Sequence, residues 1–510
     1  MFDDHLPFVV FTRLQVIAAS VIIASSFFLA LRIQKIASNR PTIIKISALL
    51  PVVFLFIQWF FLSVDVPDWD DFEAILQYLA LPEAERFSHL FDMHNEHRIV
   101  SVRLLADVIT RLVGHFSFCT FMLIGNGILA IFALLWYRVT TKIGCPWIGV
   151  AACWLFTSLL HWENLFQALC SVQNVTVMLL AFMSILLCVH TTPLKLTASV
   201  ICAITASFTS GSGIFIWPLL ILTLILEPAF NSGDWRSAFS SLRSHIYSRQ
   251  LVANIAFVAL IGGACAAIYF SLPYNRAAHI VRDFAKPGDI LLGKTTIMGY
   301  QVELTPTFIA KHLMWALCYS VRCLGGIIPF SLPALILGLF VAVGLIYIIL
   351  NLPQMKHPAL FAFLLFNIIC IISCAIFRAA SFDLVVAPRY RIVCMSTFLC
   401  VLLLLLTHIK ALNPLSHAPH IISSIFLPTS IALVLSFALF AGPCLYIRQQ
   451  GLRNNILTWP KHIEGLHFSS DRLDFADEIL KKCIKNKTYD PAYLLKENEN
   501  RPTELINIPL

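Results

Sequence analysis

The sequence is poor in charged residues, which make up only 13% of its 510 positions, whereas hydrophobic residues make up 58%. An ordinary soluble domain carries about 25% charged residues, so this chain has roughly half the usual share. The deficit excludes a water-soluble multidomain protein, and the long apolar runs exclude the disordered and fibrous classes. The composition therefore predicts a polytopic membrane protein surrounded by membrane lipid.

Several signatures of other protein classes are also missing. The 15 cysteines form no zinc-type CxxC pair and stand mostly inside apolar runs, as small packing residues do. The Lys and Arg residues behind the net charge of +8 are dispersed, so we expect no nucleic-acid partner. No nucleotide-sugar fingerprint occurs. The first residues lack the basic region of a cleaved signal peptide, so the first apolar run is expected to be a helix.

Long apolar runs dominate what is present, and a membrane-crossing helix needs about 20 mostly apolar residues. We predict an all-α polytopic membrane protein with about 10–13 transmembrane helices, because helices satisfy their own backbone groups in lipid. A barrel would instead show short alternating strands. The candidate spans are residues 14–33, 46–64, 116–137, 146–161, 172–190, 196–210, 213–228, 251–271, 331–350, 359–377, 392–409 and 421–441. The two runs between 196 and 228 also fit one broken hairpin.

Basic residues in the short loops predict the orientation of these spans. The first short loop holds four basic residues and no acid: Arg32, Lys35, Arg40 and Lys45. Such a loop is expected in the cytoplasm, and alternation then places the long loops 65–115 and 272–312 outside. The predicted organisation is a transmembrane bundle over 1–447 and a small polar extracytoplasmic tail domain over 448–510, with an amphipathic helix near 472–484.

The densest polar cluster of the chain directly follows the second apolar run, at the expected membrane boundary. Its acids are Asp65, Asp68, Asp70, Asp71 and Glu73. Asp70 and Glu73 have the spacing of a capping box, which predicts a helix over 72–81. Asp70 and Asp71 fit helix capping and solvation. They also fit a general base, because a partly desolvated carboxylate has a raised pKa. A third interpretation is that they bind a metal-bound phosphate or pyrophosphate group.

The rest of this outer loop is expected to form two more interfacial helices. Pro82 would begin the first. In the second, Ile99, Val102, Ala106, Ile109 and Leu112 or Val113 make one apolar stripe. Arg103, Asp107 and Arg111 make a solvated ladder on the other face.

A cluster of His and charged residues precedes that last helix. His94 and His97 stand one helical turn apart and could share a divalent cation, although two ligands do not define a metal site. Glu96 is a further candidate acid, and Arg98 offers a planar fork suited to phosphate. The alternative is a polar turn that binds nearby backbone.

A second candidate site lies between the apolar runs that end near 377 and begin near 392. Arg378, Arg389 and Arg391 stand there against one acid, Asp383. These arginines fit two interpretations, namely snorkelling charges at helix ends or an anion site for a lipid phosphate. The glycines and hydroxyls of 208–217 predict an outward-facing helix break that lines a cavity.

Four short strings carry a resemblance to a known enzyme family. They are Trp69-Asp-Asp-Phe72, His94-Asn-Glu-His-Arg-Ile99, Ser210-Gly-Ser-Gly-Ile-Phe-Ile-Trp-Pro218 and Pro388-Arg-Tyr390. With the paired acids, interfacial helices, many spans and polar tail, they resemble the GT-C integral membrane glycosyltransferases. Size and layout are similar to the serotype-converting O-antigen glucosyltransferases of bacteria and phages. The chain departs from that pattern by an extra apolar span before the acid loop.

The resemblance implies transfer of a sugar, with glucose as first candidate, from a polyprenyl-phosphate carrier to a surface glycan such as O-antigen. The expected location is the periplasmic face of a bacterial inner membrane. The family's loop acid falls on Asp70 or Asp71, with Glu96 next. The candidate ligands of the departing phosphate are Arg98, Arg378, Arg389 and Arg391, or a Mg²⁺ or Mn²⁺ ion held by His94 and His97.

The competing hypothesis is a secondary transporter or a lipid-sugar flippase. Such proteins usually place functional charge near the bilayer midplane, within broken helices. Here the apolar runs are almost free of acids and the polar groups gather on one outer face, which favours an enzyme.

The basic first loop generates a prediction about topology. Reporter fusions near Phe72 and Tyr489 should report an extracytoplasmic location, and one near Asn39 a cytoplasmic one, because positive loops are retained inside. A cytoplasmic tail would contradict the orientation and remove the argument for an outer enzyme face.

Overall fold

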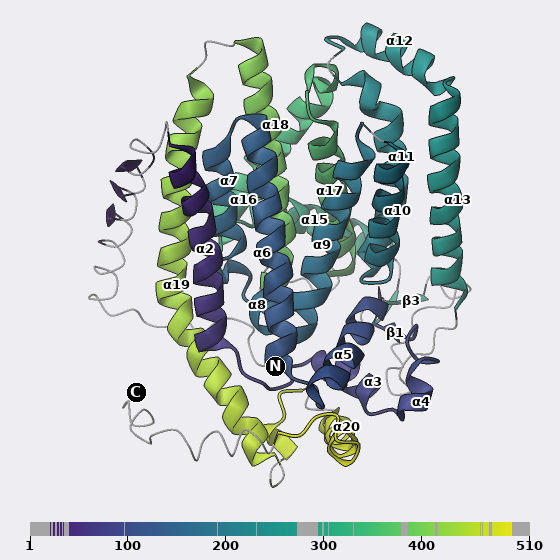
Figure 1. Ribbon diagram of the computed structural model, residues 1–510, viewed down its shortest axis with the longest axis vertical. Coiled ribbons are helices and arrows are strands. Elements are labelled where there is room, and N and C mark those ends of the chain that lie inside the picture. The colour runs from purple at the N-terminus through teal and green to yellow at the C-terminus, as the bar shows by residue number, and fades with distance from the viewer. Residues whose placement is uncertain are drawn as a thin grey trace.

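The computed structural model shows a bundle of long helices that run side by side, with short elements packed across its two ends (Figure 1). It describes residues 40–95, 97–190, 192–230, 232–272, 294–297, 300–303, 305–329, 331–378, 386–413, 417–459, 461, 463–468 and 472–491, with single residues between 21 and 34. The first expected span, 14–33, therefore lies mostly outside the described residues.

Nine helices of the described part are long and apolar enough to cross a membrane. They are α2 (Pro41–Leu62), α6 (Phe118–Ile143), α9 (Ala168–Cys188), the run of η3, α11 and η4 (Gly211–Ala229), α13 (Arg249–Ser271), α16 (Ser331–Leu350), α17 (Pro358–Arg378), α18 (Arg391–Leu412) and α19 (Ala418–Thr458). Two shorter apolar helices join them, α7 (Pro146–Phe156) and α10 (Pro193–Ser207). The predicted all-α polytopic membrane architecture is confirmed.

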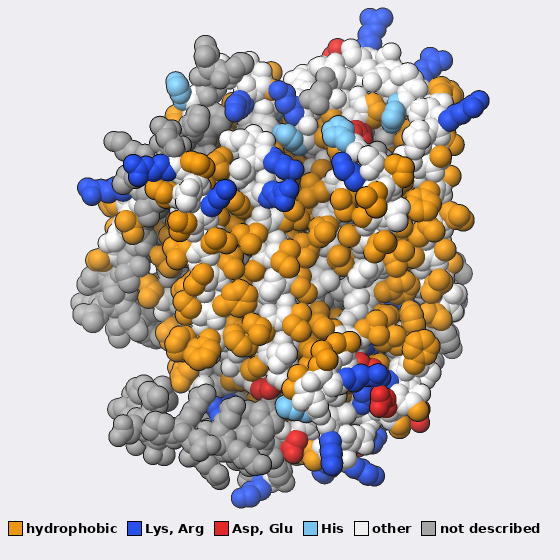
Figure 2. Space-filling view, viewed as in Figure 1, with side chains coloured by type: hydrophobic (Ala, Val, Ile, Leu, Met, Phe, Trp, Pro, Cys, Tyr) orange, Lys and Arg blue, Asp and Glu red, His pale blue; other side chains and the backbone are white. Residues whose placement is uncertain are grey.

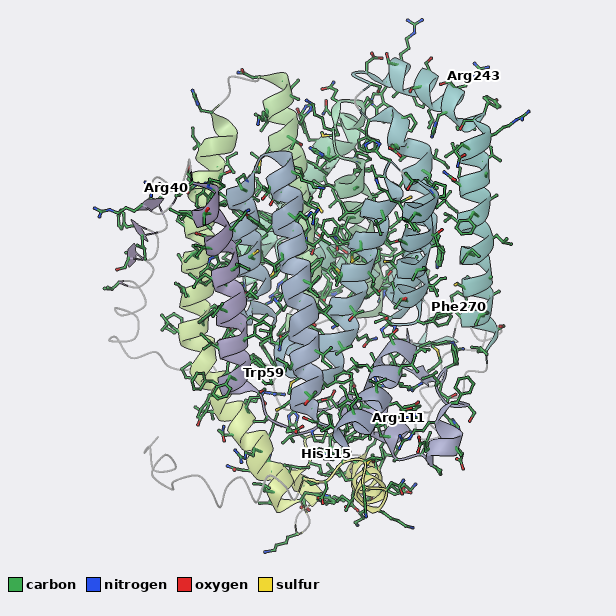
Figure 3. The ribbon with its side chains drawn as sticks, viewed as in Figure 1. Arg40, Trp59, Arg111, His115, Arg243 and Phe270 are labelled. Atoms are coloured by element: carbon green, nitrogen blue, oxygen red, sulfur yellow. The ribbon has the colours of Figure 1, made fainter. Side chains whose placement is uncertain are left out.

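The two ends of the bundle differ in the short elements that lie across them. We call one the basic end: α12 (Trp235–Ile246) lies across it, and Arg40 and Arg243 mark it in Figure 3. Figure 2 shows Lys and Arg side chains above a broad apolar belt at this end. The loops with basic residues meet at this same end in the helix order. They are the first loop, with Arg40, and the later loops with Arg138 and Lys142, with Arg236, Arg243 and Arg249, with Lys356, and with Lys410. Alternation of the spans from the first loop places all of them on one side of the membrane.

The opposite end, here called the acid-loop end, holds the short elements of the outer loop. They are η1 (Phe72–Leu76), α3 (Gln77–Leu79), α4 (Glu83–Arg86), β1 (Met93–His94), β2 (His97–Arg98) and α5 (Val100–Val113). The hairpin β3–β4 (Lys294–Ile297, Tyr300–Glu303) and α20 (Leu473–Lys485) lie at the same end (Figure 1). The remaining elements are α15 (Pro306–Leu324) and the turns η2 (Leu159–His161), α8 (Glu163–Phe166), η5 (Leu352–Gln354), η7 (Pro388–Tyr390) and η8 (Ile463–Gly465).

The helices of the outer loop follow the sequence only in part. The helix expected over 72–81 is a π-helical turn followed by one α-turn. Pro82 directly precedes α4 as expected, and the apolar stripe of α5 is buried from Ile99 to Ile109. Its expected end is wrong, because Leu112 and Val113 are exposed in the last turn of the helix.

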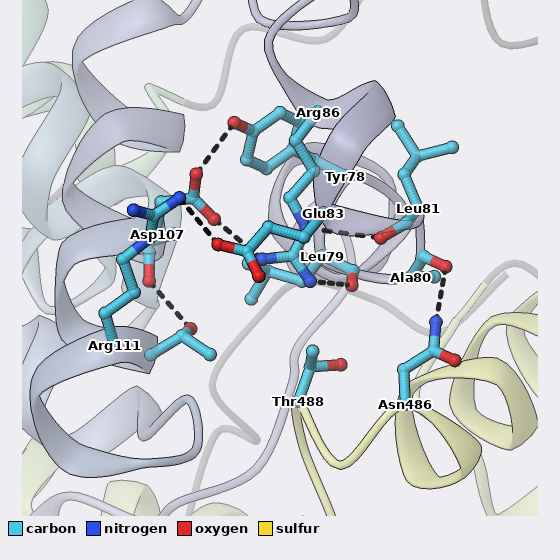
Figure 4. A network of polar contacts seen from close by, with 12 residues as sticks. Tyr78, Leu79, Ala80, Leu81, Glu83, Arg86, Asp107, Arg111, Asn486 and Thr488 are labelled. Carbon is cyan, nitrogen blue, oxygen red and sulfur yellow. Dashed lines mark hydrogen bonds and ion pairs between the residues drawn. The ribbon is translucent and has the colours of Figure 1, made fainter.

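The expected solvated ladder on α5 is wrong for Arg103 and Asp107, whereas Arg111 is exposed as expected. Arg103 is buried and donates to the carbonyl of Leu90 at 3.2 Å. Asp107 accepts from Arg86 at 2.8 Å, and Arg111 pairs with Glu83 at 2.9 Å (Figure 4). These charges therefore hold α5 against the neighbouring short helices. Each pairs with a residue of another segment and not with the residue four positions along α5.

The helix break predicted over 208–217 is present between α10 and α11. A Cβ built on Gly213 would lie 2.1 Å from the carbonyl oxygen of Ala206, so only glycine fits this crossing. The break brings the backbone N–H of Gly211 to Nδ1 of His97, at 3.2 Å. The break in the helix therefore lies where the outer loop, through His97, contacts it.

The last span extends beyond the expected residue 441. Helix α19 continues without interruption to Thr458 and reaches the acid-loop end beyond the ends of its neighbours (Figure 1). The boundary expected at 448 therefore falls inside a helix, and Arg448 lies beside Asp68 of the outer loop.

Candidate functional site

The acid segment 65–73 is placed by contacts with distant parts of the chain, beginning with Asp65. The Asp65 carboxylate accepts from the hydroxyl of Ser117 at 2.9 Å, from the backbone N–H of Cys119 at 3.2 Å and from that of Phe118. These donors form the first turn of α6, where N–H groups have no partner within the helix. Asp65 therefore caps α6, and the favourable end of the helix dipole stabilises its charge.

Asp71 performs the same function for α9. Its Oδ1 accepts from the backbone N–H of Leu169 at 2.8 Å, and its Oδ2 accepts from that of Asp68 at 3.1 Å. The side chain is fully buried, and this burial raises the pKa of Asp71 well above the usual value for an aspartate. With both oxygens engaged and no exposed surface, Asp71 positions the loop and does not reach a ligand in this structure.

Asp68 connects the acid segment to α19 and to the tail. Its carboxylate accepts from Arg448 at 2.7 Å and from the ring of His467. Burial raises the pKa of Asp68, but the charges of Arg448 and His467 outweigh this effect and hold it below the usual value. The Arg448 guanidinium also lies 4.7 Å from the ring centroid of Trp162.

Glu73 completes the attachment to the tail. Its carboxylate forms an ion pair with Arg472 beside α20. The carboxylate of Asp70, the expected N-cap, accepts no hydrogen bond from a described residue, and the residue that precedes the helix is Asp71, so the predicted capping box is wrong. Glu73 instead pairs with the half-buried Arg472, and such a charge-assisted contact is stronger than one to a single backbone N–H. The hydroxyl of Tyr489 adds a bond of 3.0 Å to the carbonyl of Asp65.

Asp70 differs from its neighbours. Its side chain is half-buried, and no described residue donates a hydrogen bond to its carboxylate or forms an ion pair with it. It interacts electrostatically with Arg389, across the chain. Among the acids of this segment, Asp70 is therefore the one whose carboxylate no described residue occupies, so it is available to a ligand.

Trp69 precedes Asp70 in an unusual conformation. Its φ is 47°, in the left-handed region that bulky residues rarely adopt, and 44% of its surface is exposed. The backbone N–H of Trp69 donates to the carbonyl of His467 at 3.1 Å, and the two rings meet edge to face at 5.9 Å. The tail therefore holds an exposed aromatic ring next to the available acid, and such strain is found mostly at functional sites.

Arg389 is the best placed of the sequence-predicted arginines. Its Nη1 lies 3.5 Å from the carboxylate of Glu163, and its carbonyl accepts from the side chain of Asn164 at 2.9 Å. These contacts orient the guanidinium while a quarter of the side chain stays exposed. Arg391 is more enclosed, since its Nη1 donates to the carbonyl of Leu160 at 3.0 Å. The neighbouring His161 is buried, and this burial lowers its pKa to about 4.

Arg98 is used differently from the expectation. It is fully buried, and its guanidinium donates to the carbonyls of Tyr269 at 2.7 Å, Leu272 at 2.6 Å and Phe91. It thereby binds the carbonyl end of α13 to the outer loop. Its predicted role as a phosphate ligand would require these bonds to break.

The two histidines do not stand one helical turn apart. They face each other across the hairpin β1–β2, in which Asn95 takes a left-handed φ of 50°. His94 accepts from Asn95 at 3.2 Å, and His97 accepts from Gly211. No group of three or more His, Cys, Asp or Glu residues that could hold a metal occurs within the described ranges. Glu96 and the side chain of Arg378 lie outside the described residues.

Sequence reasoning missed the partners that hold the site. Neither Glu163 nor Asn164 is a site residue predicted from the sequence, which places Arg448, His467 and Arg472 in a separate tail. One signal was available: Leu445, Leu452 and Ile456 recur at helical spacing beyond residue 441, which favours continuation of that helix.

Comparison of the whole chain with family models, with curated proteins and with solved structures finds no match in any of the three. The functional argument therefore depends on the geometry of these residues.

The Asp68 contacts predict a large effect on stability. Asp68→Asn should lower the free energy of unfolding by about 3 kcal/mol, because it leaves the Arg448 charge without its buried partner. Thermal unfolding in detergent would measure it, and tryptic cleavage of the tail should become faster. The control is Glu478→Gln, which removes an exposed pair with Lys482 and should cost about 0.5 kcal/mol or less. Equal losses in the two variants would contradict this account.

Proposed function

We propose that this chain is a membrane glycosyltransferase of the GT-C type, and specifically a hexosyltransferase. It transfers a sugar, with glucose as first candidate, from a polyprenyl-phosphate carrier to a surface glycan such as O-antigen. The proposed location is a bacterial inner membrane, with the acid-loop end facing the periplasm. The observation that carries the proposal is the Asp70 carboxylate, which is available and half-buried at the membrane boundary, within electrostatic reach of Arg389.

Asp70 is the general base of the proposed reaction. Its carboxylate takes the proton of an acceptor hydroxyl while that oxygen forms a bond to C1 of the donor sugar. The bond between C1 and the phosphate oxygen breaks, and polyprenyl phosphate leaves with the electron pair. A positioned base contributes about 10²–10⁴-fold to such a step. The buried neighbour Asp71 supports this role by fixing the segment to the start of α9.

Arg389 faces the leaving phosphate in this proposal. The charge that develops on the phosphate oxygens is stabilised by a guanidinium that is already oriented before the reaction. Glu163 and Asn164 supply that orientation from α8, and the exposed part of Arg389 leaves room for an anion. Arg391 adds positive charge behind it. A donor carried by a lipid explains why the site lies where the spans end.

Trp69 supplies an apolar surface beside the base. The face of a sugar ring carries C–H groups, which pack well against an aromatic ring, and the exposed indole of Trp69 is next to Asp70. The strained backbone of Trp69 supports a binding role, because the contacts with His467 maintain that strain.

The distribution of acids speaks against the transporter and the flippase. In the described membrane-crossing helices the only acid is Glu227, which accepts from the backbone of His190 at the basic end. A coupled transporter needs ionisable groups near the midplane. The polar groups here gather instead at the acid-loop end.

The assignment of the base generates a sharp prediction. Asp70→Asn should lower the rate of sugar transfer by at least about 10²-fold, because the amide cannot accept the acceptor proton. Transfer is measured with purified protein in lipid, polyprenyl-phosphate glucose and isolated glycan. Thermal stability should stay near that of the wild type, since no described contact of the protein is lost.

Glu85→Gln is the matched control, because Glu85 is an exposed acid of the same loop, and it should leave transfer unchanged. Near-normal activity of Asp70→Asn would show that the base lies elsewhere and would redirect the search to Glu96.

The arginines generate a second prediction. Arg389→Lys should raise the donor concentration needed for half-maximal transfer about tenfold, because lysine cannot reproduce the planar fork that binds a phosphate. Arg391→Lys should have a smaller effect, since one of its nitrogens already binds Leu160. Arg111→Lys at the same end is the control. Unchanged donor kinetics for both site variants would contradict a phosphate site and would indicate that the two arginines only extend to the headgroup region as charges at helix ends.

A further inference from the structure

The basic end carries a surface that the proposed transfer reaction does not use. Helix α12 lies across this end (Figure 1), attached to the bundle on one side. Ala238 is buried beneath it, and the indole nitrogen of Trp235 donates to the carbonyl of Leu350, the last residue of α16, at 3.0 Å. Helix α13 begins at Arg249, only two residues after Tyr247. These attachments fix α12 at the depth where the spans end.

The outer surface of α12 is apolar although nothing in the described chain covers it. The helical period places Trp235, Phe239 and Ile246 on one face. All three are exposed, Phe239 by 62%, and the rings of Trp235 and Phe239 lie 5.8 Å apart. The following residue, Tyr247, is 78% exposed. A stripe of this kind at the end of a span can enter the boundary between lipid headgroups and acyl chains.

Positive charge lines this apolar stripe. The same helical period places Arg236 and Arg243 side by side along one edge of it. Both are exposed, and no described residue forms an ion pair with either guanidinium (Figure 3 labels Arg243). A row of serines occupies the opposite face, so the helix is amphipathic across its whole length.

Few acids oppose this charge at the basic end. In the described part of this end they are Glu227 and Asp234. Glu227 accepts from the backbone of His190 at 3.0 Å, and Asp234 caps α12 itself by accepting from the backbone of Ser237 at 2.9 Å. Both carboxylates are therefore engaged, and Asp234 also interacts electrostatically with Arg236. Positive charge still exceeds negative charge here, since Figure 2 shows mainly Lys and Arg side chains above the apolar belt.

We propose that α12 is a binding surface for anionic phospholipid, with its apolar stripe inserted at headgroup depth and Arg236 and Arg243 meeting lipid phosphates. The positive charge of this surface favours anionic lipid over zwitterionic lipid, because a zwitterionic headgroup brings no net negative charge to balance the two arginines. Anionic headgroups hold nearby basic residues by about 1 kcal/mol each, which is about a fivefold effect per residue. The surface lies at the end opposite Asp70, so this proposal is independent of the transfer reaction.

Hydrogen exchange of the full-length protein in nanodiscs tests the proposal. We expect the α12 amides to exchange several-fold more slowly in phosphatidylcholine with phosphatidylglycerol than in phosphatidylcholine alone. The double variant Arg236→Gln with Arg243→Gln should lose this difference. The control, Arg138→Gln with Lys142→Gln, removes the same charge at the same end without an apolar stripe and should keep it. Exchange in α9 checks that each variant is folded.

Salt provides a second measurement on the unchanged protein. High ionic strength should remove the lipid-dependent protection of α12, because headgroup attraction at this depth is screened. Equal exchange in the two bilayers, or protection that persists in the Arg236 and Arg243 double variant, would overturn the proposal and favour a partner protein as the occupant.

Discussion

The first turns of α6 and α9 expose backbone N–H groups that no residue of their own helices can satisfy, and both turns lie at the acid-loop end. Asp65 and Asp71 supply the acceptors, from positions six residues apart on one short segment. Leaving such donors unpaired in a water-poor boundary would cost free energy at each helix. The path of the acid segment is therefore fixed by two helix ends, and Asp70 lies on this path with its side chain half-buried.

The remaining contacts convert this fixed path into a site. Asp68 reaches Arg448 on α19, and Glu73 reaches Arg472 beside α20, so the long last helix and the tail close over the acid segment. The positive charge that acts on Asp70 comes from another part of the chain, where Arg389 is paired with Glu163. Preorganised charge of this kind is what group transfer requires, since it stabilises the transition state without rearrangement.

Much of this arrangement follows from the sequence. Runs of apolar residues predict the spans, the glycines near 213 predict the break before α11, and the stripe from Ile99 to Ile109 predicts the buried face of α5. The partners of the charged residues do not follow, because the sequence does not show which distant arginine or helix end lies beside each carboxylate. Sequence alone therefore could not separate Asp70 from Asp71, whereas the burial of Asp71 against α9 separates them.

The most direct test of the central claim is mass spectrometry of the surface polysaccharide from cells with and without this gene. The account predicts that deletion removes one hexose substituent from the glycan, and that the intact gene restores it. It also predicts that undecorated glycan still reaches the surface, since export does not depend on this protein. An unchanged glycan in the deletion strain would contradict the glycosyltransferase proposal, and so would complete loss of surface glycan.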